Sequence, residues 1–310
     1  MCDFHVWVQV PLLAPERFFL MELKYIVNDL SNYSNVRQVL KNEFKMSNRL
    51  ITKLKQNKFI CLNGSQTYLD KSIELEDTIT CKIDFDESSQ NIIPTKMDLR
   101  ILYEDEFFIV IDKPSDMAVH PSILHYKNSL SNGVKYYFGK IGLNRKIRPV
   151  NRLDRDTTGI VIFAKNEYIQ ECLIKQMQSG TFHKEYYAIL EGVLENQEGT
   201  IDAPIARKQG SIIERCIDKN GSKAVTHYSV IKTKANLSSV KFVLETGRTH
   251  QIRLHSKYIG HPILGDTLYG KESNLIKRQA LHCHKICFVH PIKKNNLEII
   301  SPIPQDMKTI

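Results

Sequence analysis

The 310-residue sequence lacks the features that define several large classes of protein. It contains no apolar run approaching the roughly 20 residues of a transmembrane helix, which excludes a helical membrane protein. The apolar first twenty residues lack a basic n-region, carry Asp3 and are broken by Pro11 and Pro15, so we expect no signal peptide. We find no internal repeat, no low-complexity tract, and no Walker or Rossmann fingerprint for a nucleotide cofactor.

Cysteine usage and net charge narrow the choice among the classes of protein that remain. Seven cysteines are scattered along the chain, which is typical of reduced thiols in a cytoplasmic protein and not of a disulfide framework. Forty-three Lys and Arg residues against thirty-four Asp and Glu residues give a net charge of +9. A basic surface favours polyanions, nucleic acid first and anionic membrane second, although this excess is modest.

The length predicts about two domains. Residues 21–85 predict a compact α+β module, residues 86–97 a polar linker, and residues 98–310 a larger domain rich in strands. Residues 1–20 show neither helical nor strand periodicity, so we expect a dispensable extension, with Met21 as a candidate for the true start.

The small module contains two predicted helices. The first covers 34–44 behind a Ser/Asn cap, and the second starts at Ser47. A short strand at 59–63 with an Asn-Gly turn and an alternating strand at 78–85 complete it. The second helix has no acid from 46 to 60, so its basic residues form either an RNA-binding face or a solvated face: Arg49, Lys53, Lys55 and Lys58.

In the larger domain, the strand-like runs FFIVI, GIVIFA, YYAIL and SVKFVL are separated by turns and by two helices around 129–138 and 168–179. Strands outnumber helices, and their irregular order is unlike the regular alternation of a doubly wound fold.

The first cluster of chemically interesting residues is RPVNRLDRDTTG, at 148–159. Arg152, Asp154, Arg155 and Asp156 alternate in charge just before a buried-looking strand, where charges are costly unless they pair or act. A tight turn capped by Asp is the structural alternative. Residues 154–158 also fit the DxDxT pattern of Mg²⁺-dependent aspartate phosphatases. In those enzymes the apolar strand precedes the first Asp, whereas in this sequence it follows.

Two more clusters follow along the chain. In TFHKEYYAILEGV, at 181–193, Lys184 and Tyr186 enter a strand. In LETGRTHQIRLH, at 244–255, a Thr-Gly turn precedes a dense set of planar donors, which suits phosphate or carboxylate recognition. That set consists of Arg248, His250, Gln251, Arg253 and His255.

An apparent metal site lies in LHCHKICFVHP, which contains His282, Cys283, His284, Cys287 and His290. Strand alternation would place His282 and His284 on the face opposite Cys283, and the spacing has neither a CxxC pair nor an HxxxH helix. We therefore interpret the segment as a packed strand and expect no metal.

Together the three clusters resemble the pseudouridine synthases of the RluA/RluD type. That family carries HRLD-x-x-TSG, KxYxAxxxG and LxTGRxHQIRxH motifs in this order, and the chain has NRLDRDTTG, KEYYAILEG and LETGRTHQIRLH. Similar stretches are found at 102–122, 260–270 and 278–291. Residues 46–83 are similar to the S4-type RNA-binding module that precedes the catalytic domain in many members. Asn151 replaces the usual His and Thr158 the usual Ser.

The resemblance implies an α+β protein: a small S4-like module followed by a mixed, mostly antiparallel catalytic sheet domain. It makes Asp154 the essential carboxylate, Tyr186 the residue against the target base, and Arg248 the ion-pair partner of Asp154. It implies RNA as substrate, ribosomal or transfer, with no metal or other cofactor, no membrane and no DNA, and we expect a monomer. Further candidates for RNA contact are Arg49, Lys53, Lys55, Lys58, Arg152, Arg155, Lys184, His250, Gln251 and Arg253.

Two questions stay open at this point. Asp154 could attack C1′ of the ribose as a nucleophile, as in retaining glycosidases, or remove the neighbouring 2′ proton as a base. The rival function is a non-catalytic RNA-binding or ribosome-assembly protein on the same scaffold, which would have no use for a carboxylate facing phosphates.

Overall fold

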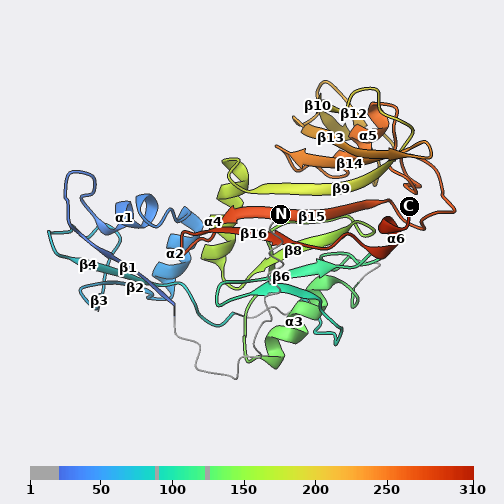
Figure 1. Ribbon diagram of the computed structural model, residues 1–310. Helices are drawn as coiled ribbons and strands as arrows, with labels where there is room; N and C mark the ends of the chain where they lie inside the picture. The colour runs from blue at the N-terminus through green and yellow to red at the C-terminus, as the bar shows by residue number, and fades with distance from the viewer. Residues whose placement is uncertain (1–20, 88–90, 123–125) are drawn as a thin grey trace, which may run out of the picture.

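The computed structural model describes residues 21–87, 91–122 and 126–310, so the expectations for residues 1–20 lie outside the described residues. A small N-terminal lobe is followed by a larger lobe built on a ten-stranded sheet (Figure 1). Within the described segments, no helix is long and apolar enough to cross a membrane.

The N-terminal lobe is a four-stranded sheet of order β1-β4-β2-β3 with two helices packed on it. Both helices were predicted, and Ser47 caps the second by accepting a hydrogen bond from the Leu50 backbone N–H. Leu50, Ile51 and Leu54 face the core of the lobe. The elements are β1 (Glu22–Ile26), α1 (Val36–Asn42), α2 (Asn48–Gln56), β2 (Ile60–Leu62), β3 (Ser65–Gln66) and β4 (Thr78–Lys82).

Two features of this part of the chain differ from the sequence interpretation. Strand β1 was not predicted, because it is an edge strand whose residues alternate between exposed and half-buried and so present no apolar face. The segment predicted as a polar linker is partly packed, since Glu87 and Ile92 are buried.

The large sheet has the order β10-β13-β14-β9-β15-β8-β6-β5, with β16 beside β15 and β7 beside β8. Its pairings are antiparallel except for the parallel pair β8–β15, which confirms the predicted mixed, mostly antiparallel α+β fold. Its strands are β5 (Ile101–Glu104), β6 (Phe108–Lys113), β7 (Arg148–Pro149), β8 (Thr158–Ala164), β9 (His183–Glu191), β10 (Glu198–Asp202), β13 (Val225–Lys234), β14 (Leu237–Leu244), β15 (Leu281–Val289) and β16 (Asn296–Ile300).

Four helices and a hairpin accompany this sheet. Helices α3 and α4 were both predicted within two residues at each end. The short hairpin β11–β12 stands apart from the sheet and lies against α5. These elements are α3 (Leu130–Lys140), α4 (Glu167–Gln178), β11 (Ile205–Arg207), β12 (Arg215–Ile217), α5 (Gln251–Tyr258) and α6 (Gln305–Lys308).

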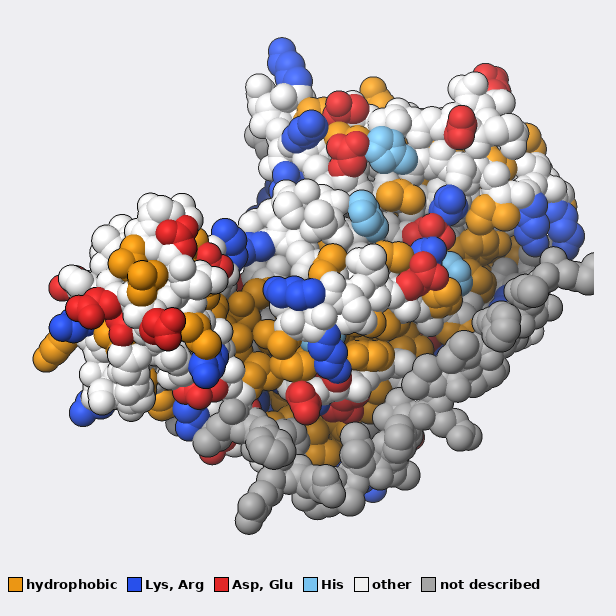
Figure 2. Space-filling model, turned by 60° about the vertical axis from the view of Figure 1, so that its left-hand side comes forward, with side chains coloured by type: hydrophobic (Ala, Val, Ile, Leu, Met, Phe, Trp, Pro, Cys, Tyr) orange, Lys and Arg blue, Asp and Glu red, His pale blue; other side chains and the backbone are white. Residues whose placement is uncertain are grey.

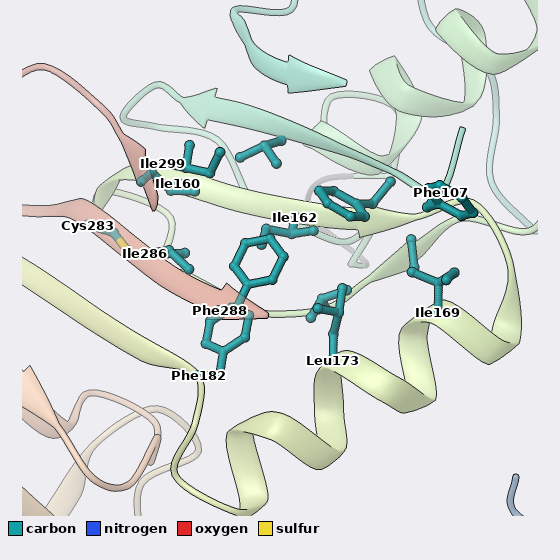
Figure 3. Close-up of a cluster of buried hydrophobic side chains, with 14 of the residues drawn as sticks. Phe107, Ile160, Ile162, Ile169, Leu173, Phe182, Cys283, Ile286, Phe288 and Ile299 are labelled. Carbon is teal, nitrogen blue, oxygen red and sulfur yellow. The ribbon is translucent and has the colours of Figure 1, made fainter. Parts of the chain in front are cut away.

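Strand β8 is buried along its whole length, because each face of the sheet at this point is covered. On one face, Ile169 and Leu173 of α4 pack with Ile162 and Phe288 (Figure 3). On the other face, α3 contributes to a second hydrophobic cluster with alternate residues of β6 and β8. A strand covered on both sides reads as a continuous apolar run, which is why GIVIFA was recognisable in the sequence.

Gly159 allows β8 to approach β15 closely. Its φ is +108°, and a Cβ placed there would lie 2.2 Å from the Cys283 carbonyl oxygen. Only glycine fits this position without displacing one of the two strands. The contact fixes the start of β8, immediately after the Asp154 loop.

The two lobes are joined by a network of charges in which the basic helix α2 contacts the buried acids Glu87 and Glu167. Lys53 binds Glu87 and, at 2.8 Å, Glu167 of α4. Arg148 grips Glu87 with two nitrogens at 2.6 and 2.8 Å, and Arg49 reaches Glu167 at 2.7 Å. Burial opposes ionisation of Glu87, but hydrogen bonds from Arg148 and Lys53 outweigh it and lower the pKa. Arg49, whose side chain is 78% exposed, and Lys53, whose side chain is 27% exposed, thus both dock the N-terminal lobe, and their contact with RNA stays a prediction.

Candidate active site

Asp154 lies in the loop between β7 and β8, and buried Asn151 closes that loop. The Asn151 side chain donates to the Ile160 carbonyl at 2.9 Å and accepts from the Ile162 backbone N–H at 2.9 Å. One side chain thus ties the start of the loop to the strand that ends it. Since a neutral histidine also offers one donor and one acceptor, the departure from the usual His keeps the required hydrogen-bonding groups.

Buried Lys113, at the end of β6, holds the same loop by hydrogen bonds to backbone carbonyl groups. Its ammonium donates to the carbonyl oxygens of Pro114, Met117 and Arg155 at 2.8, 2.9 and 2.8 Å. Burial lowers the pKa of Lys113 to about 7, against the opposing effect of Asp156 and Asp154. Its three hydrogen bonds fix the backbone next to Asp154.

The Asp154 carboxylate forms an ion pair with Arg253. The Arg253 Nη1 atom lies 3.1 Å from Asp154 Oδ2, and its Nε and Nη2 atoms bind the fully buried Asp266 at 2.7 and 2.8 Å. Asp266 is itself fixed by the backbone N–H groups of Leu268 and Tyr269. Burial opposes the charge of Arg253, but Asp266 and then Asp154 raise its pKa. Asp266 binds two nitrogens of the guanidinium, so that the third nitrogen, Nη1, reaches Asp154 at the exposed end of the site.

The expectation that Arg248 pairs with Asp154 is wrong. Arg248 lies in the turn before α5, exposed to solvent, and its Nε donates to the Lys223 carbonyl at 2.9 Å. Arg253 lies in the first turn of α5, and helical side chains lean toward the N-terminus of their helix, which brings its guanidinium to Asp154. Arg248 nevertheless lines the same pocket.

Asp154, Tyr186 and Arg248 line one small cavity of about 60 Å³. The side chain of Asp154 is 25% exposed, whereas Tyr186 is buried on β9. Burial raises the pKa of Tyr186 well above its usual value, so its hydroxyl stays protonated. The structure therefore brings together the three residues predicted to be catalytic, although their roles stay predictions.

His250 also lines this cavity, and both of its ring nitrogens face polar partners. The Arg215 backbone N–H donates to the Tyr269 hydroxyl oxygen at 2.8 Å, and the same hydroxyl forms a hydrogen bond of 3.0 Å with His250 Nδ1. The other His250 nitrogen, Nε2, lies 3.9 Å from Asp154 Oδ2. Burial lowers the pKa of His250, which keeps it neutral beside the carboxylate.

The remaining candidates for RNA contact fall into two groups. Gln251 is buried and bonds Thr246, Thr226 and two backbone groups, so it builds the turn and is not available to RNA. Lys184 is largely enclosed on β9, and burial lowers its pKa. The others are exposed: Lys55 and Lys58 on the N-terminal lobe, Arg152 at the cavity, and Arg155, which pairs with Asp156.

The histidines of the apparent metal site serve as hydrogen-bonding groups. His282 lies between the Thr158 hydroxyl, at 2.9 Å, and the Ser301 carbonyl, at 3.2 Å. His284 binds the same carbonyl at 2.7 Å, and His290 binds Asp105 at 2.8 Å. These hydrogen bonds support the interpretation of this segment as a packed strand.

Three residues that position the site were not singled out from the sequence: Lys113, Asp266 and Tyr269. Each lies in a stretch that resembles the family, in 102–122 or 260–270. The available signal was a charged or polar residue flanked by apolar ones, which does not say what the side chain contacts.

Comparison with known proteins identifies the family to which this fold belongs. Residues 107–258 match the RNA pseudouridylate synthase family model. An uncharacterized RNA pseudouridine synthase of Bacillus subtilis (strain 168), YjbO, is 38% identical over 86% of this chain and 95% of its own. A ribosomal large subunit pseudouridine synthase D of Zymomonas mobilis is 35% identical over 81% of this chain and 84% of its own.

Solved structures show the same fold. The human RNA pseudouridylate synthase domain containing 1 superposes with a TM-score of 0.56 at 24% identity, covering 70% of this chain and 86% of that one. The chain belongs to the RNA pseudouridine synthase family, and its enzymatic class is that of an isomerase acting on RNA.

Proposed function

We propose that the protein converts specific uridines of ribosomal RNA to pseudouridine, with Asp154 as the essential carboxylate. The observation that carries this proposal is the ion pair of Asp154 with Arg253 at a cavity that Tyr186 also lines. The choice of ribosomal over transfer RNA rests on relatives named for the ribosomal large subunit. RNA as substrate, with DNA excluded, and a monomeric state belong to the same proposal.

The reaction is an isomerisation that keeps every atom of the RNA except the carbon-bound hydrogen on C5, which is replaced by a hydrogen on N1. The bond from N1 to C1′ breaks, the uracil turns, C5 bonds to C1′, the proton on C5 leaves and N1 takes up a proton. An ionised carboxylate beside C1′ serves either role left open above, as nucleophile or as base. Arg253 binds Oδ2 of Asp154, which leaves Oδ1 for the sugar. This chemistry requires no metal, nucleotide or redox cofactor.

A nucleobase enters only if the cavity widens, because ligand pockets typically measure about 300–1,000 Å³ and this one measures about 60 Å³. Arg248 is the wall residue that can move most easily, since it is exposed and its guanidinium has one hydrogen bond, to the Lys223 carbonyl, in the described chain. Tyr186 and Arg253 are buried and remain fixed. A flipped uridine would displace Arg248 and meet a preformed carboxylate and ring.

The N-terminal lobe would bind RNA with a face other than the one that contacts the catalytic domain. Lys55 and Lys58 are exposed on this lobe, whereas Arg49 and Lys53 are paired. On the face drawn in Figure 2, Lys and Arg side chains are interspersed with Asp and Glu side chains. RNA affinity would therefore come from a few local contacts and not from a uniformly basic surface.

The test is to map pseudouridines in total RNA from cells with and without the gene, then to complement the deletion with wild type or Asp154→Asn. We expect sites that disappear with the gene, return with wild type and stay absent with Asp154→Asn. Equal melting temperatures and RNA affinities would show that the variant is folded. Restoration by Asp154→Asn would overturn the role of Asp154, and a deletion without missing sites would favour the non-catalytic alternative.

The role of Asp154 can be tested separately with uridine deuterated at C2′ in the substrate RNA. If Asp154 is the base, the C2′–H bond breaks, and single-turnover formation of pseudouridine is slowed by a primary isotope effect. If it is the nucleophile, that bond stays intact and the rate is nearly unchanged. Each outcome eliminates one of the two alternatives.

A further inference from the structure

A second and larger cavity, of about 320 Å³, lies between the hairpin β11–β12 and helix α5. Tyr269 connects this cavity to the catalytic cavity. The Tyr269 side chain lines the second cavity, and its hydroxyl binds His250 Nδ1, which lines the first. Its volume falls in the range that holds a small ligand.

The lining combines cations with an exposed aromatic ring. Lys208 is paired with Glu214 at 2.8 Å, whereas Arg215 and Lys257 have no carboxylate within 4.0 Å in the described part of the chain. Tyr258 is 60% exposed at the end of helix α5, most of whose other residues are buried. Apolar side chains of β12 and α5 complete the lining.

We infer that this cavity is a subsite for one unpaired nucleotide of the RNA that neighbours the target uridine. Arg215 and Lys257 would bind its phosphate, and Tyr258 would stack on its base. Two cations without a carboxylate partner beside an exposed aromatic ring suit single-stranded nucleic acid, because every nucleotide carries one phosphate and one stacking surface. The inference rests on the proposed function for the identity of the RNA.

The subsite is connected to the catalytic carboxylate. The backbone N–H of Arg215 holds the Tyr269 hydroxyl, which is hydrogen-bonded to Nδ1 of His250 beside Asp154. A nucleotide bound to Arg215 would stabilise β12 and, through Tyr269, the orientation of His250. Tyr269 is thus a positioning residue. Tyr269→Phe keeps the ring but loses the bond to His250, and it should lower kcat with little change in KM.

Cys216 provides a direct test, because this half-buried thiol lines the subsite. The full-length protein is treated with N-ethylmaleimide with and without saturating single-stranded octauridylate, and alkylation of each cysteine is followed by mass spectrometry. We expect the RNA to slow alkylation of Cys216 about five-fold or more, and to leave Cys287 on β15, a half-buried thiol outside the cavity, unchanged. Equal rates at Cys216 with and without RNA would overturn the inference.

Matched variants then identify the contacts. Arg215→Gln and Lys257→Gln should each reduce the slope of log affinity against log salt by about 0.7, the value for one phosphate contact on a single strand. Tyr258→Ala should weaken octauridylate binding about five-fold or more without changing the slope. Lys140→Gln, which removes an exposed charge at the end of α3, is the control. Subsite variants that bind like Lys140→Gln would contradict the inference.

Two outcomes separate this inference from the proposed function. If the wild-type protein forms pseudouridine while Cys216 stays fully reactive, the subsite is wrong and the function stands. If RNA protects Cys216 while no pseudouridine depends on the gene, the binding site stands and the proposed function is wrong.

Discussion

Replacing Arg253 and Arg248 separately by lysine tests which guanidinium supports Asp154. Arg253 makes three contacts with two carboxylates, at 2.7 and 2.8 Å to Asp266 and at 3.1 Å to Asp154. A lysine keeps the charge, but its single ammonium cannot occupy all three positions. Loss of one hydrogen bond to a charged group costs about 1.5–3 kcal/mol. If that loss falls on the contact with Asp154, the rate of isomerisation should drop about 10- to 150-fold.

Arg248→Lys is the matched control, because it makes the same chemical change five positions away in the same cavity wall. Arg248 is exposed and bonds only a backbone carbonyl in the described chain, so its replacement should lower the rate less than about five-fold. The assay is single-turnover formation of pseudouridine with enzyme in excess, alongside urea unfolding of both variants. A larger loss in Arg248→Lys than in Arg253→Lys would refute the ion pair as the catalytic arrangement.

Three further predictions concern buried polar residues near the site and the ion pairs between the two lobes. Asn151→Asp should lower the free energy of unfolding by about 1–3 kcal/mol, because a carboxylate would face the Ile160 carbonyl. Asn151→His, which keeps a donor and an acceptor, should cost less in the same urea titration. Burial lowers the pKa of His282 to about 4, so the unfolded chain binds the proton more tightly, and stability should fall by roughly 3 kcal/mol as pH drops from 6.5 to 4. His282→Asn should flatten that dependence in urea unfolding at several pH values, and an unchanged slope would show that His282 does not titrate there. Lys53→Gln should speed proteolytic cleavage within 85–97, whereas Lys55→Gln, exposed on the same helix, should not.

The fold was predictable wherever burial imposed a pattern on the sequence. Helix α2 shows apolar residues at helical spacing behind a serine cap, and β8 shows an unbroken apolar run because both of its faces are covered. Strand β1 has neither signal. It pairs through its backbone at a sheet edge, and backbone hydrogen bonding leaves no mark on residue type.

The catalytic motifs identified which residues gather at the site, but not which pairs form. Arg248 and Arg253 stand in one motif, and residue types and spacing fit either as the partner of Asp154. The choice depends on where α5 begins. His250 adopts a left-handed conformation with φ of +59° just before the helix, which leaves Arg248 in the preceding turn and Arg253 in the first helical turn. Asp266, the third member, lies 13 residues after Arg253, but no motif in the sequence marked it as the partner of that guanidinium.

The charges of α2 likewise show that the sequence does not reveal which charged residues become paired when the chain folds. A helix without acids was interpreted from its own residues as either a binding face or a solvated face, and Lys53 is neither. Its partners, Glu87 and Glu167, belong to separate segments of the chain and meet at the Lys53 ammonium in the folded interface. Removing a partner from a buried ion pair leaves an uncompensated charge, so these acids hold α2 firmly once it has docked. Glu87 and Glu167 thus pair with Lys53 and Arg49, two of the four cations of this segment that were predicted to contact RNA. If this lobe binds RNA as proposed, the exposed Lys55 and Lys58 are the remaining candidates of this segment for that contact.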